Sequence, residues 1–127
     1  MMSIFVSYTT RDHYVDRNTL EMVSSVLLNY GSHYIDLLHN EASEKQRHVE
    51  RMLFNSQLII LIRSRSIEKS KWVQWELNEA NRIGIPIIEV QASINPTETI
   101  RNLEYKLDLE FNKLTRRSSK DALTRAA

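Results

Sequence analysis

Hydrophobic and polar positions along this chain form short apolar runs that alternate with longer stretches of helical spacing. Runs at residues 4–6, 33–35, 58–62 and 85–90 predict four buried strands, the last with Pro86 tolerated at its beginning. The run at 58–62 contains only leucine and isoleucine, which is typical of a strand covered on both faces. Strands that alternate with helices favour right-handed crossovers and a parallel sheet. The pattern therefore predicts an α/β fold, an open parallel sheet of four or five strands with helices on both faces.

Four stretches have the three- to four-residue spacing of amphipathic helices, at residues 15–30, 44–55, 70–83 and 97–114. We expect Asp12 or Thr10 to cap the first helix at its start, and the pattern favours Asp12. Gly31 is predicted to end the first helix, and Gly84 the third. Residues 107–111 also alternate between apolar and polar, so a short fifth strand is a second interpretation of that stretch.

We expect residues 1–114 to form a single domain. No internal repeat or linker divides the chain, and its 127 residues suffice for one core of ordinary size. Residues 115–127 are polar and lack a pattern, which predicts a flexible C-terminal tail. Residues 37–43 are predicted to form a polar loop.

Composition narrows the kinds of site that this domain can hold. The formal net charge is +1 and no basic stripe with interleaved aromatic residues occurs, so we expect no nucleic-acid partner. The chain has no cysteine, which excludes disulfides and thiolate metal sites and fits a cytoplasmic location. Its four histidines show no spacing that places two on one helical face, so we expect no metal site. No apolar run is long enough for a membrane span or a signal peptide, so we expect no membrane association.

Glu76 is the residue in this sequence that most needs an explanation. At about 100° per residue, it lies about 40° from Trp72 and about 40° from Ala80, inside the apolar arc of its helix. A buried carboxylate must be paired, protonated or directed into a polar cleft, and such carboxylates are candidates for functional sites. The alternative is that Glu76 reaches out at the edge of the arc and pairs with a lysine or arginine.

Topology predicts where a ligand would meet Glu76. Ligands of open parallel sheets bind outside the carboxyl ends of the strands, and Tyr8 and Asp36 follow the first two strands. Trp72 and Glu76 begin the helix after the third strand, so we expect these four side chains to line one cleft. Only two glycines occur, which excludes a P-loop and a Rossmann fingerprint. A nucleotide would therefore have to be held by side chains and helix ends.

The ordered set of segments resembles a TIR domain (Toll/interleukin-1 receptor/resistance), particularly the bacterial TIR and TIR-like proteins of antiviral defence. The resemblance covers about residues 3–90 and rests on Ile4-Phe5-Val6-Ser7-Tyr8, Tyr34-Ile35-Asp36, and Ser70-Lys71-Trp72-Val73-Gln74-Trp75-Glu76-Leu77. It implies a flavodoxin-like fold with a central parallel sheet of five strands. It fades beyond about residue 95.

The resemblance also implies an activity. Many TIR domains are enzymes that cleave NAD⁺ at the nicotinamide–ribose bond, with the glutamate at the position of Glu76 as the catalytic carboxylate. We therefore expect NAD⁺ as the substrate, no cofactor, and nicotinamide plus ADP-ribose or a cyclic ADP-ribose as products. A cyclic product would be a signal for a downstream effector in antiphage defence. The resemblance further implies self-association through TIR–TIR contacts.

Other site residues follow from the resemblance more weakly. It implies that Tyr8, Thr9 and Thr10 line the substrate cleft and that Arg11 offsets the diphosphate charge. Trp72 would stack on a ring of the nucleotide or, alternatively, anchor the core. Asp36 would flank the site or serve as a turn residue at the strand end.

Two other functions remain open at this stage. One is a non-enzymatic module that signals, or acts as a decoy, through TIR–TIR contacts, with Glu76 in an ion pair. The other is a nucleoside-processing enzyme of the 2-deoxyribosyltransferase type, which shares the open sheet and a catalytic glutamate. The extended match around Trp72 and Glu76 argues against the second.

Overall fold

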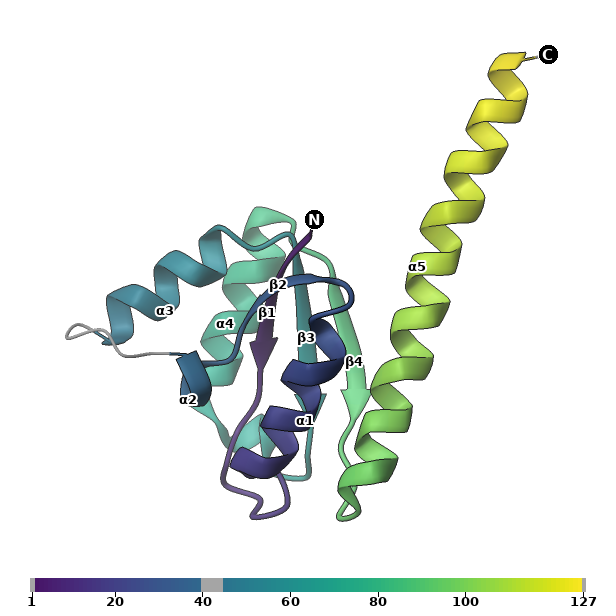
Figure 1. Ribbon diagram of the computed structural model, residues 1–127. Coiled ribbons are helices and arrows are strands. Elements are labelled where there is room, and N and C mark those ends of the chain that lie inside the picture. The colour runs from purple at the N-terminus through teal and green to yellow at the C-terminus, as the bar shows by residue number, and fades with distance from the viewer. Residues whose placement is uncertain (1, 40–44, 127) are drawn as a thin grey trace.

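The computed structural model describes residues 2–39 and 45–126, with side chains described as far as Phe111. Its centre is a sheet of four parallel strands in the order β2-β1-β3-β4 (Figure 1). The strands are β1 (Met2–Ser7), β2 (Gly31–Tyr34), β3 (Leu58–Arg63) and β4 (Ile87–Gln91). The strand order changes direction between β1 and β3, which makes the carboxyl ends of these strands the expected ligand site. The predicted flavodoxin-like α/β fold is confirmed, with four strands in the described residues.

Helices cover both faces of the sheet (Figure 1). Helices α1 (Arg17–Leu27) and α5 (Pro96–Ala126) pack on one face, where Leu20 and Leu103 join a core cluster with Ile60 of β3. Helices α3 (Lys45–Phe54) and α4 (Lys71–Ile83) pack on the other, where Ala80 joins Phe5 of β1. Successive strand residues point to opposite faces, so β1, β3 and β4 each supply both clusters.

The first helix has different ends from those that we predicted. Its N-cap is Asp16, whose Oδ1 accepts from the backbone N–H of Thr19 at 2.9 Å, so neither Thr10 nor Asp12 is the cap. Asp12 is held elsewhere: its carboxylate accepts from Ser66, 54 residues along the chain. The local pattern therefore could not show which of two nearby aspartates was available for capping.

Gly31 does not cap this helix either, because it is the first residue of β2. It pairs with Met2 of β1, and a Cβ at this position would lie 2.1 Å from the Met2 carbonyl oxygen. Glycine is thus required by the close approach of two strands. Gly84, by contrast, ends α4 in the left-handed conformation with φ 83°, as predicted.

The stretch predicted as a loop at 37–43 begins as a short helix, α2 (Asp36–His39); the rest of that prediction lies outside the described residues. Leu38 and His39 donate their backbone N–H groups to the Ile35 carbonyl, at 3.0 Å each. In return, His39 Nδ1 accepts from the Ile35 N–H at 2.9 Å. These contacts fix the chain directly after β2 in a tight turn. A single turn of 3₁₀-helix, η1 (Ile67–Lys69), similarly connects β3 to α4.

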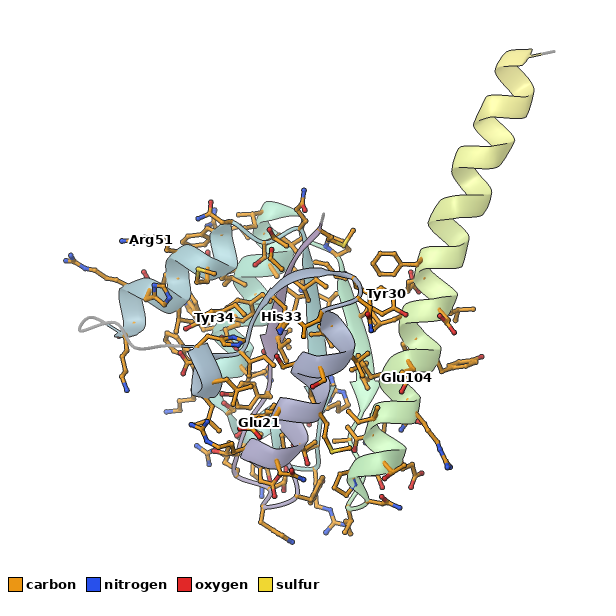
Figure 2. The ribbon with its side chains drawn as sticks, in the orientation of Figure 1. Glu21, Tyr30, His33, Tyr34, Arg51 and Glu104 are labelled. Carbon is orange, nitrogen blue, oxygen red and sulfur yellow. The ribbon has the colours of Figure 1, made fainter. Side chains whose placement is uncertain are left out.

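The alternative interpretation of residues 107–111 as a fifth strand is wrong, because they belong to α5. Leu103 and Leu107 are fully buried on its inner side, and Tyr30 packs against Phe111 with ring centroids 4.9 Å apart (Figure 2). The helix does not stop at residue 114 but continues to Ala126, past the end of the sheet (Figure 1). The backbone is therefore helical where we expected an irregular tail. The division at residue 114 between a domain and a tail stays a prediction.

Within residues 2–39 and 45–126, no helix combines the length and the apolar character needed to cross a membrane.

Candidate active site

A cleft of about 270 Å³ opens at the carboxyl end of β1, between the start of α2 and the first turns of α4. It contains every side chain that the sequence predicted for the site except Arg11. The residues that line it are Val6, Tyr8, Thr9, Thr10, Asp36, Leu37, Trp72 and Glu76. Side chains that follow the ends of β1 and β2 thus meet those of α4 in one cleft, as the topology predicts.

Glu76 lies at the inner end of this cleft and is only 4% exposed. Its Oε1 accepts a hydrogen bond of 2.8 Å from the Ser7 hydroxyl at the end of β1. None of the ion pairs among the described residues includes Glu76, so it is not the surface-paired carboxylate of the alternative interpretation. A buried carboxyl group that lines a cleft and belongs to no described ion pair is a candidate for binding a ligand.

Burial raises the pKa of Glu76 to about 8. The negative charge of Asp36 raises this pKa further, whereas hydrogen bonding by Ser7 and Trp72 lowers it. At neutral pH the empty cleft thus favours the protonated form of Glu76. A cation in the cleft would favour the ionised form, because an opposite charge stabilises a carboxylate.

The rim of the cleft is fixed by hydrogen bonds between the ends of β1 and β2. The Tyr34 hydroxyl donates to Asp36 Oδ1 at 2.8 Å, and the Tyr8 hydroxyl accepts from the Leu37 N–H at 2.8 Å. On the outer side, Arg17 Nη2 donates to the Leu37 carbonyl at 3.2 Å. Burial raises the pKa of Tyr8 to about 12, so its phenol stays neutral. Asp36 and Leu37 are therefore held in place before any ligand binds.

Trp72 forms the opposite rim. It is 38% exposed, and its ring stacks on Trp75 one turn below, with centroids 5.2 Å apart and planes 17° apart. One indole face is supported by another indole while the side chain remains accessible from the cleft. This arrangement is better suited to stacking on a ligand than to anchoring the core.

The sequence as a whole matches one protein family. The TIR-like domain of the Thoeris protein ThsB matches residues 5–97, which is most of the chain and includes every residue that lines the cleft. The chain belongs to this TIR-like family. Thoeris is an antiphage defence system, so the chain is a TIR module related to defence. No curated protein matches the sequence.

One predicted site residue of this TIR-like domain does not reach the cleft. Thr9 is buried, and its hydroxyl oxygen accepts from the Arg11 N–H at 3.3 Å, which turns the chain after β1. Thr9 and Thr10 face Glu76, but Arg11 lies on the other side of the turn and borders a separate depression. The cleft thus holds no arginine from this turn.

The sequence argument missed Ser7, which supplies the closest contact to Glu76. A signal was present: Phe5 and Ser7 point to the same face of β1, since side chains in a strand alternate. Phe5 packs in the cluster that contains Ala80 of α4. Any polar residue two positions after Phe5 was therefore directed toward the helix that carries Glu76.

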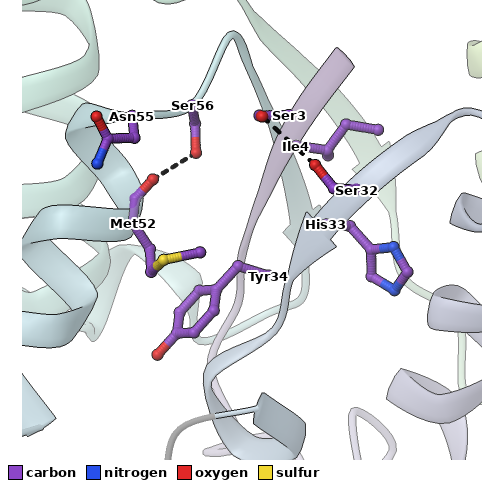
Figure 3. Close-up of a pocket in the computed structure, with 8 residues that line it drawn as sticks. All are labelled: Ser3, Ile4, Ser32, His33, Tyr34, Met52, Asn55 and Ser56. Carbon is purple, nitrogen blue, oxygen red and sulfur yellow. Dashed lines mark hydrogen bonds between the residues drawn. The ribbon is translucent and has the colours of Figure 1, made fainter. Parts of the chain in front are cut away.

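A smaller cavity of about 80 Å³ lies on the β2 side of the sheet and is lined by Ser3, Ser32, His33 and Met52, among others (Figure 3). Its hydroxyl groups have partners: Ser3 and Ser32 lie 3.4 Å apart, and Ser56 donates to the Met52 carbonyl at 2.6 Å. The volume admits only a few water molecules. Across the described part of the chain, no group of three or more His, Asp or Glu side chains could hold a metal ion.

Proposed function

We propose that this TIR-like domain cleaves NAD⁺ at the bond between nicotinamide and ribose. The products would be nicotinamide and either ADP-ribose or a cyclic isomer of it, which would serve as a signal to a downstream effector in antiphage defence. The observation that carries the proposal is Glu76: a carboxyl group 4% exposed, outside any described ion pair, at the inner end of a preformed cleft. NAD⁺ is a substrate here, and the proposed chemistry requires no cofactor.

The main requirement of this reaction is to stabilise the positive charge that develops on the ribose. Nicotinamide leaves as a neutral molecule, so it needs little acid assistance, but the ribose develops positive charge in an oxocarbenium-like transition state. An ionised carboxylate directed at that ribose stabilises the charge. A second role for Glu76, as a general base toward water or an acceptor hydroxyl, would use the same ionised form.

The raised pKa of Glu76 links substrate binding to proton release. In the empty cleft, burial keeps the carboxyl group protonated up to about pH 8. The positively charged nicotinamide ring of NAD⁺ would lower that pKa on entering, because charge attraction favours the carboxylate. The cleft would thus acquire its catalytic charge in response to the cationic half of the substrate.

The other cleft residues would position the substrate. Trp72, supported by Trp75, would stack on the nicotinamide ring, and Tyr8 and the two threonines would line the wall opposite. Asp36 would border the ribose, with its carboxylate oriented by the Tyr34 hydroxyl.

The first test is product analysis by mass spectrometry after incubation with NAD⁺. We expect nicotinamide release by the wild type and a loss of at least about 100-fold in Glu76→Gln, the size of effect seen when a charge-stabilising group is removed. Glu79→Gln is the matched control, because Glu79 lies on the same helix and pairs with Arg82 at the surface. Release that survives Glu76→Gln in folded protein would contradict the proposal.

The dependence of the rate on pH tests the same residue separately. Since only the ionised form is active, kcat/KM should rise with pH and level off above about pH 8, the pKa of Glu76 in the free protein. The midpoint for kcat should lie lower, because bound substrate stabilises the carboxylate. A kcat/KM that is flat between pH 6 and 9 would exclude the assigned role.

A second candidate function is an interaction module that works through TIR–TIR contacts. Two large apolar side chains at the rim of the cleft favour it, since Leu37 is 40% exposed and Trp72 is 38% exposed. In such a module Leu37→Asp would abolish self-association in sedimentation experiments, whereas Glu76→Gln would leave it unchanged. The enzyme would instead lose nicotinamide release with Glu76→Gln whatever its state of association.

A further inference from the structure

A second depression borders the strand ends and does not contain Glu76. It lies on the other side of the turn after β1 and has a volume of about 630 Å³. The residues that line it are Arg11, Asp12, His13, Tyr14, Arg65, Gln91, Ala92 and Ile94. Gln91 is the last residue of β4 and the others come from the segments that follow β1, β3 and β4, so this is also a site at the carboxyl ends of parallel strands. Its volume falls in the range of about 300–1,000 Å³ typical of small-molecule sites, while the Glu76 cleft is smaller.

The border of the depression is basic. Arg11 and Arg65 are exposed, and neither takes part in an ion pair among the described residues. The acidic group nearby, Asp12, is already bound: its two carboxylate oxygens accept from the backbone N–H and the hydroxyl of Ser66 at 2.7 and 2.8 Å. The neighbouring Ser64 hydroxyl, the hydrogen bonds from Ser66 and the positive charge of Arg65 hold the pKa of Asp12 below its usual value. The two guanidinium groups therefore face a site whose one carboxylate is occupied.

The other residues that border the depression are suited to contact with the ring of a ligand as well as with a charged group. The Tyr14 hydroxyl accepts from the Arg65 N–H at 3.1 Å, which leaves its own proton for another acceptor. The His13 ring meets the edge of Tyr14 with centroids 5.9 Å apart. Ile94 is 77% exposed, an apolar side chain that nothing in the described chain covers. Gln91 adds an exposed amide that can donate a hydrogen bond to, or accept one from, a heteroatom of a base.

We propose that this depression binds a nucleoside phosphate, with the phosphate between Arg11 and Arg65 and the base against Tyr14 and Ile94. Arginine provides paired N–H donors that match phosphate oxygens, and the aromatic and apolar groups provide the contact for a base. Asp12 is engaged by Ser66, and among the described residues no other carboxylate borders the depression, so the proposal concerns binding alone.

The ligand has two conceivable sources with the same chemistry. It could be the adenosine phosphate half of a dinucleotide that crosses the turn at Thr10 from the Glu76 cleft, since this turn separates the two hollows. It could also be a separate nucleotide that binds beside an occupied or empty cleft. Binding in either case is independent of whether NAD⁺ is cleaved.

The test is a titration of the full chain with AMP, followed by NMR shifts or calorimetry. We expect Arg65→Gln and Arg11→Gln each to weaken AMP binding at least 10-fold, and adenosine without phosphate to bind at least 10-fold more weakly than AMP. Arg51→Gln is the matched control, because Arg51 is an exposed arginine on α3, on the far side of the molecule (Figure 2). All variants change exposed side chains, and circular dichroism melts will show that they remain folded.

Failure of AMP to bind at millimolar concentration would overturn the inference, as would equal affinity in the wild type and both arginine variants. A competition experiment with Glu76→Gln then separates the two sources. Displacement of AMP by NAD⁺ would identify the depression as the place of the adenosine half, and simultaneous binding would identify a separate nucleotide site. Neither result depends on turnover, so a failure here and a failure of the proposed NAD⁺ cleavage are distinguishable.

Discussion

At the scale of single residues, the burial of Glu76 makes the stability of the domain depend on pH. The carboxyl group has an ordinary pKa of 4.5 in the unfolded chain and about 8 in the folded one. Between these values the folded state holds a proton that the unfolded state has released. The contribution of this group to stability is therefore fully present below about pH 4.5 and is lost as the pH rises through about 8.

We predict that Glu76→Gln removes this dependence. Above pH 8 the wild type buries a charge that the glutamine variant lacks, so the variant should gain stability relative to the wild type by an amount on the order of a few kcal/mol between pH 5 and pH 9. Urea unfolding at both pH values measures the difference. Parallel curves for the two proteins would mean that Glu76 is not buried in the manner described.

Glu76 and its neighbours show which site residues can be placed from the sequence alone. Helical angles placed Glu76 inside an apolar arc, and strand ends placed Tyr8 and Asp36 beside it, because both arguments depend on fixed backbone geometry. The position of Arg11 depended on which way one turn bends, and hydrogen bonding between Thr9 and Arg11 decides that. Side chains on regular elements could thus be assigned, whereas those on turns could not.

At the scale of elements, the two glycines of the chain are required for two different structural reasons. Gly84 adopts a left-handed conformation with open space around it, so Gly84→Ala should cost about 1 kcal/mol. Gly31→Ala would place a Cβ 2.1 Å from the Met2 carbonyl oxygen and force β1 and β2 apart, which should cost several times more. Denaturant midpoints of the two variants give the comparison. A smaller loss for Gly31→Ala would show that the strand edge adjusts freely.

Most elements were predictable because their apolar spacing is strong, as in β3 and α4. The errors fall where a contact distant in sequence competes with a local preference. Asp12 is drawn to Ser66 and leaves Asp16 to cap α1. Leu107 alternates with its neighbours as a strand residue would, yet it joins the core cluster that contains Leu20 of α1 and Ile60 of β3.

At the scale of the whole molecule, the first half of α5 supplies residues to the core. Leu103 and Leu107 are buried, and the helix then continues beyond the sheet (Figure 1). We predict that a chain ending at residue 114 keeps the melting temperature of the full chain to within a few degrees. A chain ending before Leu103 should fail to fold, because it loses two buried leucines at about 2–5 kcal/mol each. Thermal melts of both truncations decide whether the boundary at 114 is correct.

The hydrogen bond between Ser7 and Glu76 joins residues 69 positions apart. During synthesis β1 emerges from the ribosome well before α4, because it lies nearer the N-terminus. Until α4 has emerged and packed, Glu76 cannot contact Ser7, and the cleft lacks the two residues that α4 supplies, Trp72 and Glu76. A growing chain would therefore lack the proposed activity until the sheet and its covering helix have been translated.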